Sequence, residues 1–266
     1  MELNHLAAFL ISLPTDPALP PSDCFPVNCP GDRKIHDDLM ESMLDYYRKE
    51  TTERQKHAED GHLFNVFDLW NRFSGLGETV HSRLIHFLLY PDPRHGQGSK
   101  YLVPFLEMLG VSKPMEGNWT ITAEKGRVDV RLVRDNPKSV ILIENKSNWA
   151  VDQHNQIYRY WYQNIHTKRE DCSADYYVDK DFRIIYLAPN KWKEVSEDSL
   201  SKPSREWFGQ CGEYDCLPDM VPISPITWTF DNEFAEWLRL CIDITPEGNT
   251  PLRNYLTQYM NYCKKL

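Results

Sequence analysis

The segment VILIENKSNWAVDQHNQIYRYWYQN, residues 140–164, joins a strongly apolar run to a group of charged and aromatic residues. Residues 140–143 are all β-branched or aliphatic, which is typical of a strand buried on both faces. Glu144 and Lys146 follow at once, and side chains two residues apart on a strand point to the same side. The sequence therefore predicts a carboxylate and an ammonium group next to each other at the end of a buried strand.

The residues before this strand predict a hairpin. In GRVDVRLVRDNPKSVILIENK, the turn between the two strands is expected at DNPK, residues 135–138, because Asn, Asp and Pro favour turns. If Asp135 lies opposite Lys138, the same register places Asp129 opposite Glu144, with their Cβ atoms about 5 Å apart. Two carboxylates this close repel each other unless a positive charge lies between them.

A divalent cation is the natural counter-charge, because Mg²⁺ or Mn²⁺ binds one or two carboxylates and keeps waters and phosphate oxygens as its other ligands. We expect Asp129, Glu144 and the carbonyl of Asn145 to be the metal ligands. Lys146 would orient or deprotonate a water, or stabilise charge on a phosphate. These parts suit metal-assisted hydrolysis of a phosphodiester. A plainer interpretation stays open, since strand ends often carry charges and a Glu-x-Lys pair alone is a weak motif.

The rest of the chain predicts an α/β fold. Periodic apolar residues and turn signals indicate helices at about 1–14, 36–58, 78–91, 101–110, 152–166, 231–242 and 251–266. They indicate strands at about 118–125, 126–135, 138–145, 182–189 and 225–230. Residues 12–33 hold many prolines and predict a loop or extended segment. This order is expected to form a mixed β-sheet flanked by helices, with further helices at both ends of the chain.

Charge and cysteine content narrow the functional classes. The net charge of −9 argues against a broad basic surface for nucleic acid, although a local metal site remains compatible with it. No apolar run reaches the roughly 20 residues of a membrane span, and the N-terminus lacks a basic signal-peptide region, so a cytoplasmic protein is expected. Cys24/Cys29 and Cys211/Cys216 share one spacing and would suit zinc. Free thiols are the favoured interpretation, because the spacing exceeds the usual zinc knuckle.

Asp129 followed by Glu144-Asn145-Lys146 after an apolar strand resembles the PD-(D/E)XK nuclease superfamily, whose fold is restriction-endonuclease-like. Val128 stands where the proline of the motif name would be. QIYRY at 156–160 is similar to a Q-x3-Y motif. Residues 78–96 resemble a bacterial family with an E-x2-HS helix and an HG loop. The resemblance covers roughly residues 60–190 and is not expected to reach the first 55 residues or the C-terminal third.

This resemblance implies a Mg²⁺-dependent nuclease acting on DNA, with residues 1–60 as an extension and 61–266 as the nuclease-like domain. It implies that Glu78 is a further metal ligand or water-positioning acid, and that Gln156 and Tyr160 bind the substrate. His81 and His95 are further candidates for phosphate contact, against a helix contact for His81 and a solvated loop position for His95. A homo-oligomer is left open.

Two further groups of side chains and two rival functions stay open. Arg127 and Arg159 could contact phosphate or be solvated surface residues. The aromatic residues around 149–162 could stack on unpaired bases, although core packing is the favoured interpretation. A non-catalytic nucleic-acid or protein-binding module on the same fold is one rival function. A metal-free hydrolase with two carboxylates is the other, and Lys146 disfavours it.

Overall fold

The computed structural model describes residues 30–61, 63–92, 94–169, 181–209 and 212–266, with side chains from residue 38 onward. The chain divides into two compact units, Met1–Phe64 and Asn65–Leu266. In the first unit α2 (Pro30–Glu59) is a single long helix that begins earlier than the predicted residue 36, and its described side chains are exposed. The helix predicted at 1–14 lies outside the described residues. None of the described helices has the length and apolar character needed to cross a membrane.

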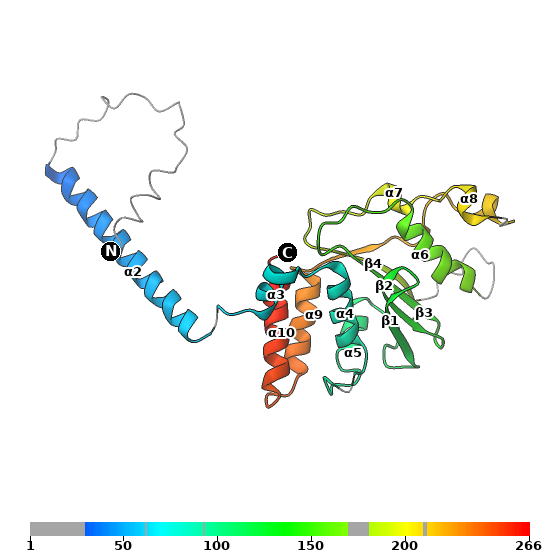
Figure 1. The fold of residues 1–266 in the computed structure, drawn as a ribbon, viewed down its shortest axis with the longest axis horizontal. Coiled ribbons are helices and arrows are strands. Elements are labelled where there is room, and N and C mark those ends of the chain that lie inside the picture. Colours follow the sequence, from blue (N-terminus) through cyan, green and yellow to red (C-terminus); the bar gives the residue numbers. More distant parts are fainter. Residues whose placement is uncertain (1–29, 62, 93, 170–180, 210–211) are drawn as a thin grey trace, which may run out of the picture. The chain divides into compact units, whose positions relative to one another are not determined.

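The second unit is built around a five-stranded mixed sheet (Figure 1). Its strands lie in the order β1 (Trp119–Lys125), β2 (Val128–Arg134), β3 (Ser139–Asn145), β4 (Asp181–Ala188) and β5 (Ile226–Thr229). The first three strands pair antiparallel, whereas β3–β4 and β4–β5 pair in parallel. The carboxyl ends of β3 and β4 therefore lie at the same edge of the sheet.

The hairpin of β2 and β3 has the register that the turn predicts. Val130 pairs with Ile143 and Arg134 pairs with Ser139, so each pair of residue numbers has the same sum as 129 and 144. This confirms the predicted pairing. Asp129 and Glu144 consequently lie on neighbouring strands at one edge of the sheet, one position beyond the pair Val130 and Ile143.

Helices cover both faces of the sheet, which explains the continuous apolar run of β3. Helices α3 (Val66–Ser74), α4 (Glu78–Leu89), α5 (Leu102–Met108), α9 (Glu233–Ile244) and α10 (Thr250–Cys263) share one core with one face. Ile141 and Ile143 point into that core, whereas Val140 and Leu142 point into a second core under α6 (Gln156–Asn164). The short helices η2 (His166–Lys168), α7 (Glu197–Leu200), α8 (Arg205–Phe208) and η4 (Tyr214–Cys216) complete the described elements. The predicted α/β class, with a mixed sheet flanked by helices, is confirmed.

Two predicted helix starts are wrong. Helix α6 begins at Gln156 rather than at Asp152, because the Asp152 side chain accepts hydrogen bonds from elsewhere and Asn155 has a positive φ of 55°. Asp231 does not cap α9; Asn232 occupies the N-cap position and its side chain makes no capping hydrogen bond.

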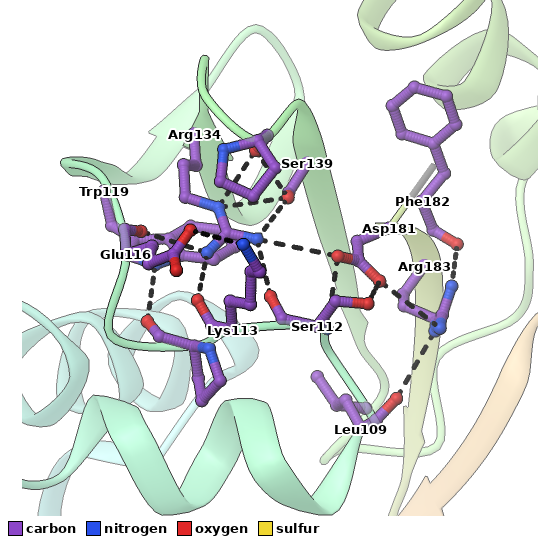
Figure 2. A network of polar contacts seen from close by, with 12 residues as sticks. Leu109, Ser112, Lys113, Glu116, Trp119, Arg134, Ser139, Asp181, Phe182 and Arg183 are labelled. Carbon is purple, nitrogen blue, oxygen red and sulfur yellow. Dashed lines mark hydrogen bonds and ion pairs between the residues drawn. The ribbon is translucent and has the colours of Figure 1, made fainter. Parts of the chain in front are cut away.

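The edge of the sheet opposite Glu144 is closed by a buried arginine (Figure 2). Arg134, fully buried at the end of β2, donates hydrogen bonds to the carbonyl oxygens of Ser112, Lys113, Glu116 and Pro137 and to the hydroxyl of Ser139. Its Nη2 lies 3.5 Å from Oδ2 of Asp181, the first residue of β4, and its guanidinium lies over the ring of Trp119 at 4.6 Å. These contacts join β2, β3 and β4 to the loop that precedes β1.

Candidate active site

Asp129 and Glu144 form the acidic centre of the opposite edge. The N–H of Asn145 donates a 2.7 Å hydrogen bond to Asp129 Oδ2, which fixes this carboxylate against the end of β3. Burial, followed by the repulsion of the nearby Glu144 carboxylate, raises the pKa of Asp129 to about 8. Burial also raises the pKa of Glu144, whose side chain is 3% exposed. The charged form of both carboxylates is therefore unfavourable in this site, and a bound cation would stabilise it.

Lys146 is the charged neighbour that the strand spacing predicts. Its Nζ lies 2.7 Å from Glu144 Oε1 and 3.7 Å from Asp152 Oδ1, and it donates a 3.2 Å hydrogen bond to Gln156 Oε1. Burial alone would lower the pKa of Lys146, but the carboxylates of Glu144, Asp152 and Glu78 together raise it above the usual value. Lys146 therefore keeps its proton at neutral pH.

Glu78 reaches the same site from the first turn of α4. The side-chain amide of Asn145 donates to the Glu78 carbonyl at 2.8 Å and to the Ser82 hydroxyl at 3.2 Å, so the end of β3 is tied to the start of this helix. Burial raises the pKa of Glu78, although Lys146 and nearby backbone N–H groups partly oppose this shift. The helix thus contributes a third carboxylate beside Lys146.

Gln156 and Tyr160 share one face of α6, as their spacing of four residues requires. The Gln156 amide donates to the Tyr160 hydroxyl at 2.9 Å, while its carbonyl oxygen accepts from Lys146. Burial, followed by the Glu144 and Asp129 carboxylates, raises the pKa of the Tyr160 phenol, which stays protonated. A continuous polar chain therefore runs from Glu144 through Lys146 and Gln156 to Tyr160.

One pocket of about 390 Å³ is lined by all of these side chains together, namely Glu78, Asp129, Glu144, Lys146, Gln156 and Tyr160. Within the described part of the chain, the buried oxygens Glu144 Oε2 and Glu78 Oε1 have no hydrogen-bond partner. Buried acceptors normally find a donor or an ion. The pocket therefore has acceptor capacity that the protein itself does not fill.

These donor atoms fit a divalent cation. No three His, Cys, Asp or Glu side chains in the described ranges lie close enough together to hold one metal ion by themselves. Mg²⁺ needs no such set, because it usually takes one or two carboxylates and completes its octahedron with water and phosphate oxygens. The free oxygen of Glu144 and the raised pKa of Asp129 are consistent with this pattern.

The two histidine candidates lie away from this pocket. His81 is fully buried, its Nδ1 lies 2.9 Å from the Tyr259 hydroxyl, and burial lowers its pKa to about 4. It has no exposed surface through which to contact a phosphate. His95 is 4% exposed and bridges its own loop, with Nε2 2.8 Å from the Tyr90 carbonyl and Nδ1 3.0 Å from the Gln97 amide nitrogen. It is an ordered loop residue rather than a solvated one.

Sequence reasoning missed Asp152, which is buried beside Lys146. Tyr186 donates to Asp152 Oδ1 at 2.8 Å, and the N–H of Ser196 donates to Oδ2 at 2.8 Å. Asp152 thus connects Lys146 to β4 and to the segment that follows it. The only signal in the sequence was an acidic residue shortly after the motif strand.

The two cysteine pairs, for which free thiols were favoured over zinc, lie mostly outside the described residues. Cys24, Cys29 and Cys211 fall there, whereas Cys216 is an exposed free thiol.

The fold and this pocket define an α/β protein with an acidic, lysine-containing site at one edge of a mixed sheet. The chain matches the PD-(D/E)XK nuclease superfamily over residues 64–261, which is well over half of its length. It therefore belongs to that superfamily. Nucleases of this superfamily generally use divalent metals. No curated protein and no solved structure matches the chain.

The extent of the match corrects one prediction. The resemblance was expected to end near residue 190, yet the match continues to residue 261. The reason is structural: Phe234 of α9 and Leu256 of α10 are buried in the same core as Ile143 of β3. The C-terminal helices are part of the domain, and their apolar pattern alone carries no motif that would identify them.

Proposed function

We propose that the chain is a metal-dependent nuclease that hydrolyses phosphodiester bonds in DNA. The observation that carries this proposal is that Glu78, Asp129, Glu144 and Lys146 line one pocket, in which Glu144 and Glu78 each have a carboxylate oxygen without a hydrogen-bond partner among the described residues. A bound metal ion would supply the missing positive charge, and the phosphodiester with waters would complete the ligands of the metal.

Each residue has a distinct role in this proposal. Asp129, Glu144 and the Asn145 carbonyl would hold Mg²⁺ or Mn²⁺, which supplies charge stabilisation at the phosphate when bound. Lys146, which keeps its proton, stabilises negative charge as a water oxygen bonds to phosphorus and the bond to the leaving sugar oxygen breaks. Glu78 positions that water and accepts its proton, because its raised pKa makes it a stronger base than a solvated glutamate.

The substrate-facing side of the pocket is formed by α6. Gln156 orients Lys146 through a 3.2 Å hydrogen bond, and the protonated Tyr160 phenol can donate to a phosphate oxygen. We further propose that residues 61–266 suffice for this activity. A non-catalytic binding module is the alternative, and the complete set of three carboxylates with Lys146 disfavours it.

The test is cleavage of linear and circular DNA, single- and double-stranded, and of RNA, with Mg²⁺, Mn²⁺ or EDTA. Lys146→Ala is expected to lower the rate by about 10²–10³-fold, the range for loss of one transition-state charge contact. Lys100→Ala is the matched control, because Lys100 is exposed and does not line the pocket. Equal rates for the two variants, or cleavage that persists in EDTA, would overturn the proposal.

A further inference from the structure

Tryptophans occur on three segments that form or border this pocket. Trp207 of α8 lines it directly, beside Gln163 and Arg159 of α6. Trp149, next to the lining residue Ala150, is 47% exposed. Large exposed aromatic rings cost free energy in water, so their concentration beside a polar pocket needs an explanation.

Trp149 is held outward by an unusual backbone conformation. Its φ is 59°, in the left-handed region that bulky side chains rarely adopt. The conformation is fixed by the hydrogen bond from the Trp149 N–H to the Lys146 carbonyl at 3.0 Å. Strained positions of this kind cluster at ligand-binding sites, because the surrounding structure must offset their cost. The strain thus links an exposed indole to the same turn that positions Lys146.

Trp192 lies on the segment after β4, which borders the same site. Its side chain is 76% exposed. The neighbouring Lys193 is close enough to lower the pKa of Glu78, and Ser196 is hydrogen-bonded to Asp152 at 2.8 Å. The chain is therefore tied to the acidic site directly after Trp192, and one cation, Lys191 Nζ, lies over the exposed ring at 4.9 Å.

Cations for a phosphate backbone lie at the same mouth. Arg127 and Arg159 both line the pocket. Arg127 is the second residue of a two-residue turn between β1 and β2, where Gly126 and Arg127 both have a φ of 68°. Such turns favour Gly or Asn at this position, so an arginine here is a second strained residue on the rim.

The aromatic residues of α6 behave differently. Tyr158 and Trp161 are fully buried in the core under the helix, as the favoured interpretation of the sequence expects. Among the described tryptophans near this pocket, the ones with exposed or half-buried rings are Trp149, Trp192 and Trp207. Stacking on bases can therefore involve these three.

From this rim we infer that the site takes a single strand of DNA with unpaired bases, which stack on Trp149 and Trp192 while Arg127 and Arg159 contact its phosphates. In a duplex the base faces are already stacked on each other and present no free surface to an indole. This inference rests on the proposed function for the choice of DNA, but its test needs no cleavage.

The test is the affinity of the full chain for a fluorescein-labelled DNA strand and for its blunt duplex, measured in EDTA by fluorescence anisotropy, with an RNA strand of the same sequence as a third probe. The single strand is expected to bind at least about tenfold more tightly than the duplex, and Trp149→Ala and Trp192→Ala should each weaken it about 5- to 100-fold. Trp149→Phe should restore most of the affinity, because it keeps a ring that can stack.

Trp70→Ala is the matched control. Trp70 is 42% exposed on α3, which packs against α10 and contributes nothing to the pocket lining. Its loss should leave the affinity unchanged. Equal binding of strand and duplex, or wild-type affinity in both rim variants, would overturn the inference even if the protein cuts DNA. Trp-dependent binding of the strand without cleavage under any condition would uphold the inference and reject the nuclease.

Discussion

A cationic side chain is buried at each of the two edges of the sheet, and the polar groups around the two side chains differ. At one edge Arg134 donates to four carbonyl oxygens and a hydroxyl, and Asp181 balances its charge. At the other edge Lys146 meets Glu144 at 2.7 Å and Asp152 at 3.7 Å, with Glu78 nearby. One network has its donors satisfied, whereas the other has an excess of acceptors.

This difference separates stability from function within one fold. A closed network of buried polar groups holds strands in place, and its disruption leaves acceptors without donors. An excess of buried negative charge does the reverse: it costs folding free energy until a cation or a phosphate-bound metal arrives. We therefore expect mutations at the Arg134 edge to act on stability and those at the Lys146 edge to act on chemistry.

The largest effect is expected from Arg134→Met. The substitution keeps the apolar stem but removes the charge, so the surrounding carbonyl oxygens lose their donor and Asp181 loses its buried counter-charge, and the free energy of unfolding should fall by about 3–5 kcal/mol. Arg183→Met on the neighbouring strand is the control, because Arg183 is partly exposed (27%) and should cost under about 1 kcal/mol. Urea denaturation measures both, and equal losses would contradict the comparison.

The second effect is a dependence of the free energy of unfolding on pH, which arises at the acidic edge. The pKa of Asp129 is about 8 in the folded protein against 3.8 in the unfolded chain. The folded state thus holds a proton that the unfolded state lacks, and stability falls as pH rises towards 8. His81, with a folded pKa of about 4 against 6.5, loses stability as pH falls through that range and so opposes the Asp129 effect below pH 6.5.

The free energy of unfolding should therefore show a net decrease between pH 6.5 and 8. The decrease should amount to about 2 kcal/mol, at 1.36 kcal/mol per pH unit for one proton. Denaturant titrations in EDTA across this window would measure it. Asp129→Asn should flatten the slope, whereas Asp135→Asn, in the exposed turn at the Arg134 edge, should keep it. A wild-type slope in Asp129→Asn would show that the pKa of Asp129 is not the source.

The same contrast explains what the sequence could predict. The apolar run and the turn residues set the register of β2 and β3, so the pairing of Asp129 with Glu144 followed from local rules. Lys146 followed from the period of two along a strand. These contacts lie within one hairpin, where sequence separation and spatial separation are closely linked.

Contacts that depend on distant segments were not predictable. Asp152 gained its role from Ser196 and from Tyr186, which reach it only after β4 has paired with β3. His81 is a residue type that often contacts phosphate, but here it lies in the core, because Tyr259 of α10 packs against it. Arg134 gave no sign of burial, because its acceptors are mostly backbone carbonyls that carry no sequence signature.

The third prediction concerns added metal. Mg²⁺ or Mn²⁺ at a fixed concentration, ten times its Kd at pH 8, should raise the free energy of unfolding at that pH by about 1.4 kcal/mol, because a ligand that binds only the folded state stabilises it. The gain should be greater at pH 8 than at pH 6.5, since the carboxylates must lose their protons to bind. Glu144→Gln should abolish it and Glu116→Gln, at the Arg134 edge, should not. A shift of equal size in both variants would indicate nonspecific binding.

The smallest effect is expected from Asp152→Asn, which tests whether Asp152 positions Lys146. The asparagine can still accept from Tyr186 or Ser196, but it removes one of the carboxylates that raise the pKa of Lys146. We expect kcat to fall about threefold to tenfold with KM little changed, because Asp152 helps to hold the Lys146 ammonium in place and a loss of roughly 0.7–1.4 kcal/mol of transition-state stabilisation corresponds to that factor. The alkaline limb of the pH–rate profile should also move to lower pH, since Lys146 then loses its proton more easily. Asp198→Asn, on the exposed surface of α7, is the control and should keep the wild-type profile. An alkaline limb that also stays in place in Asp152→Asn would show that Asp152 has a structural role only.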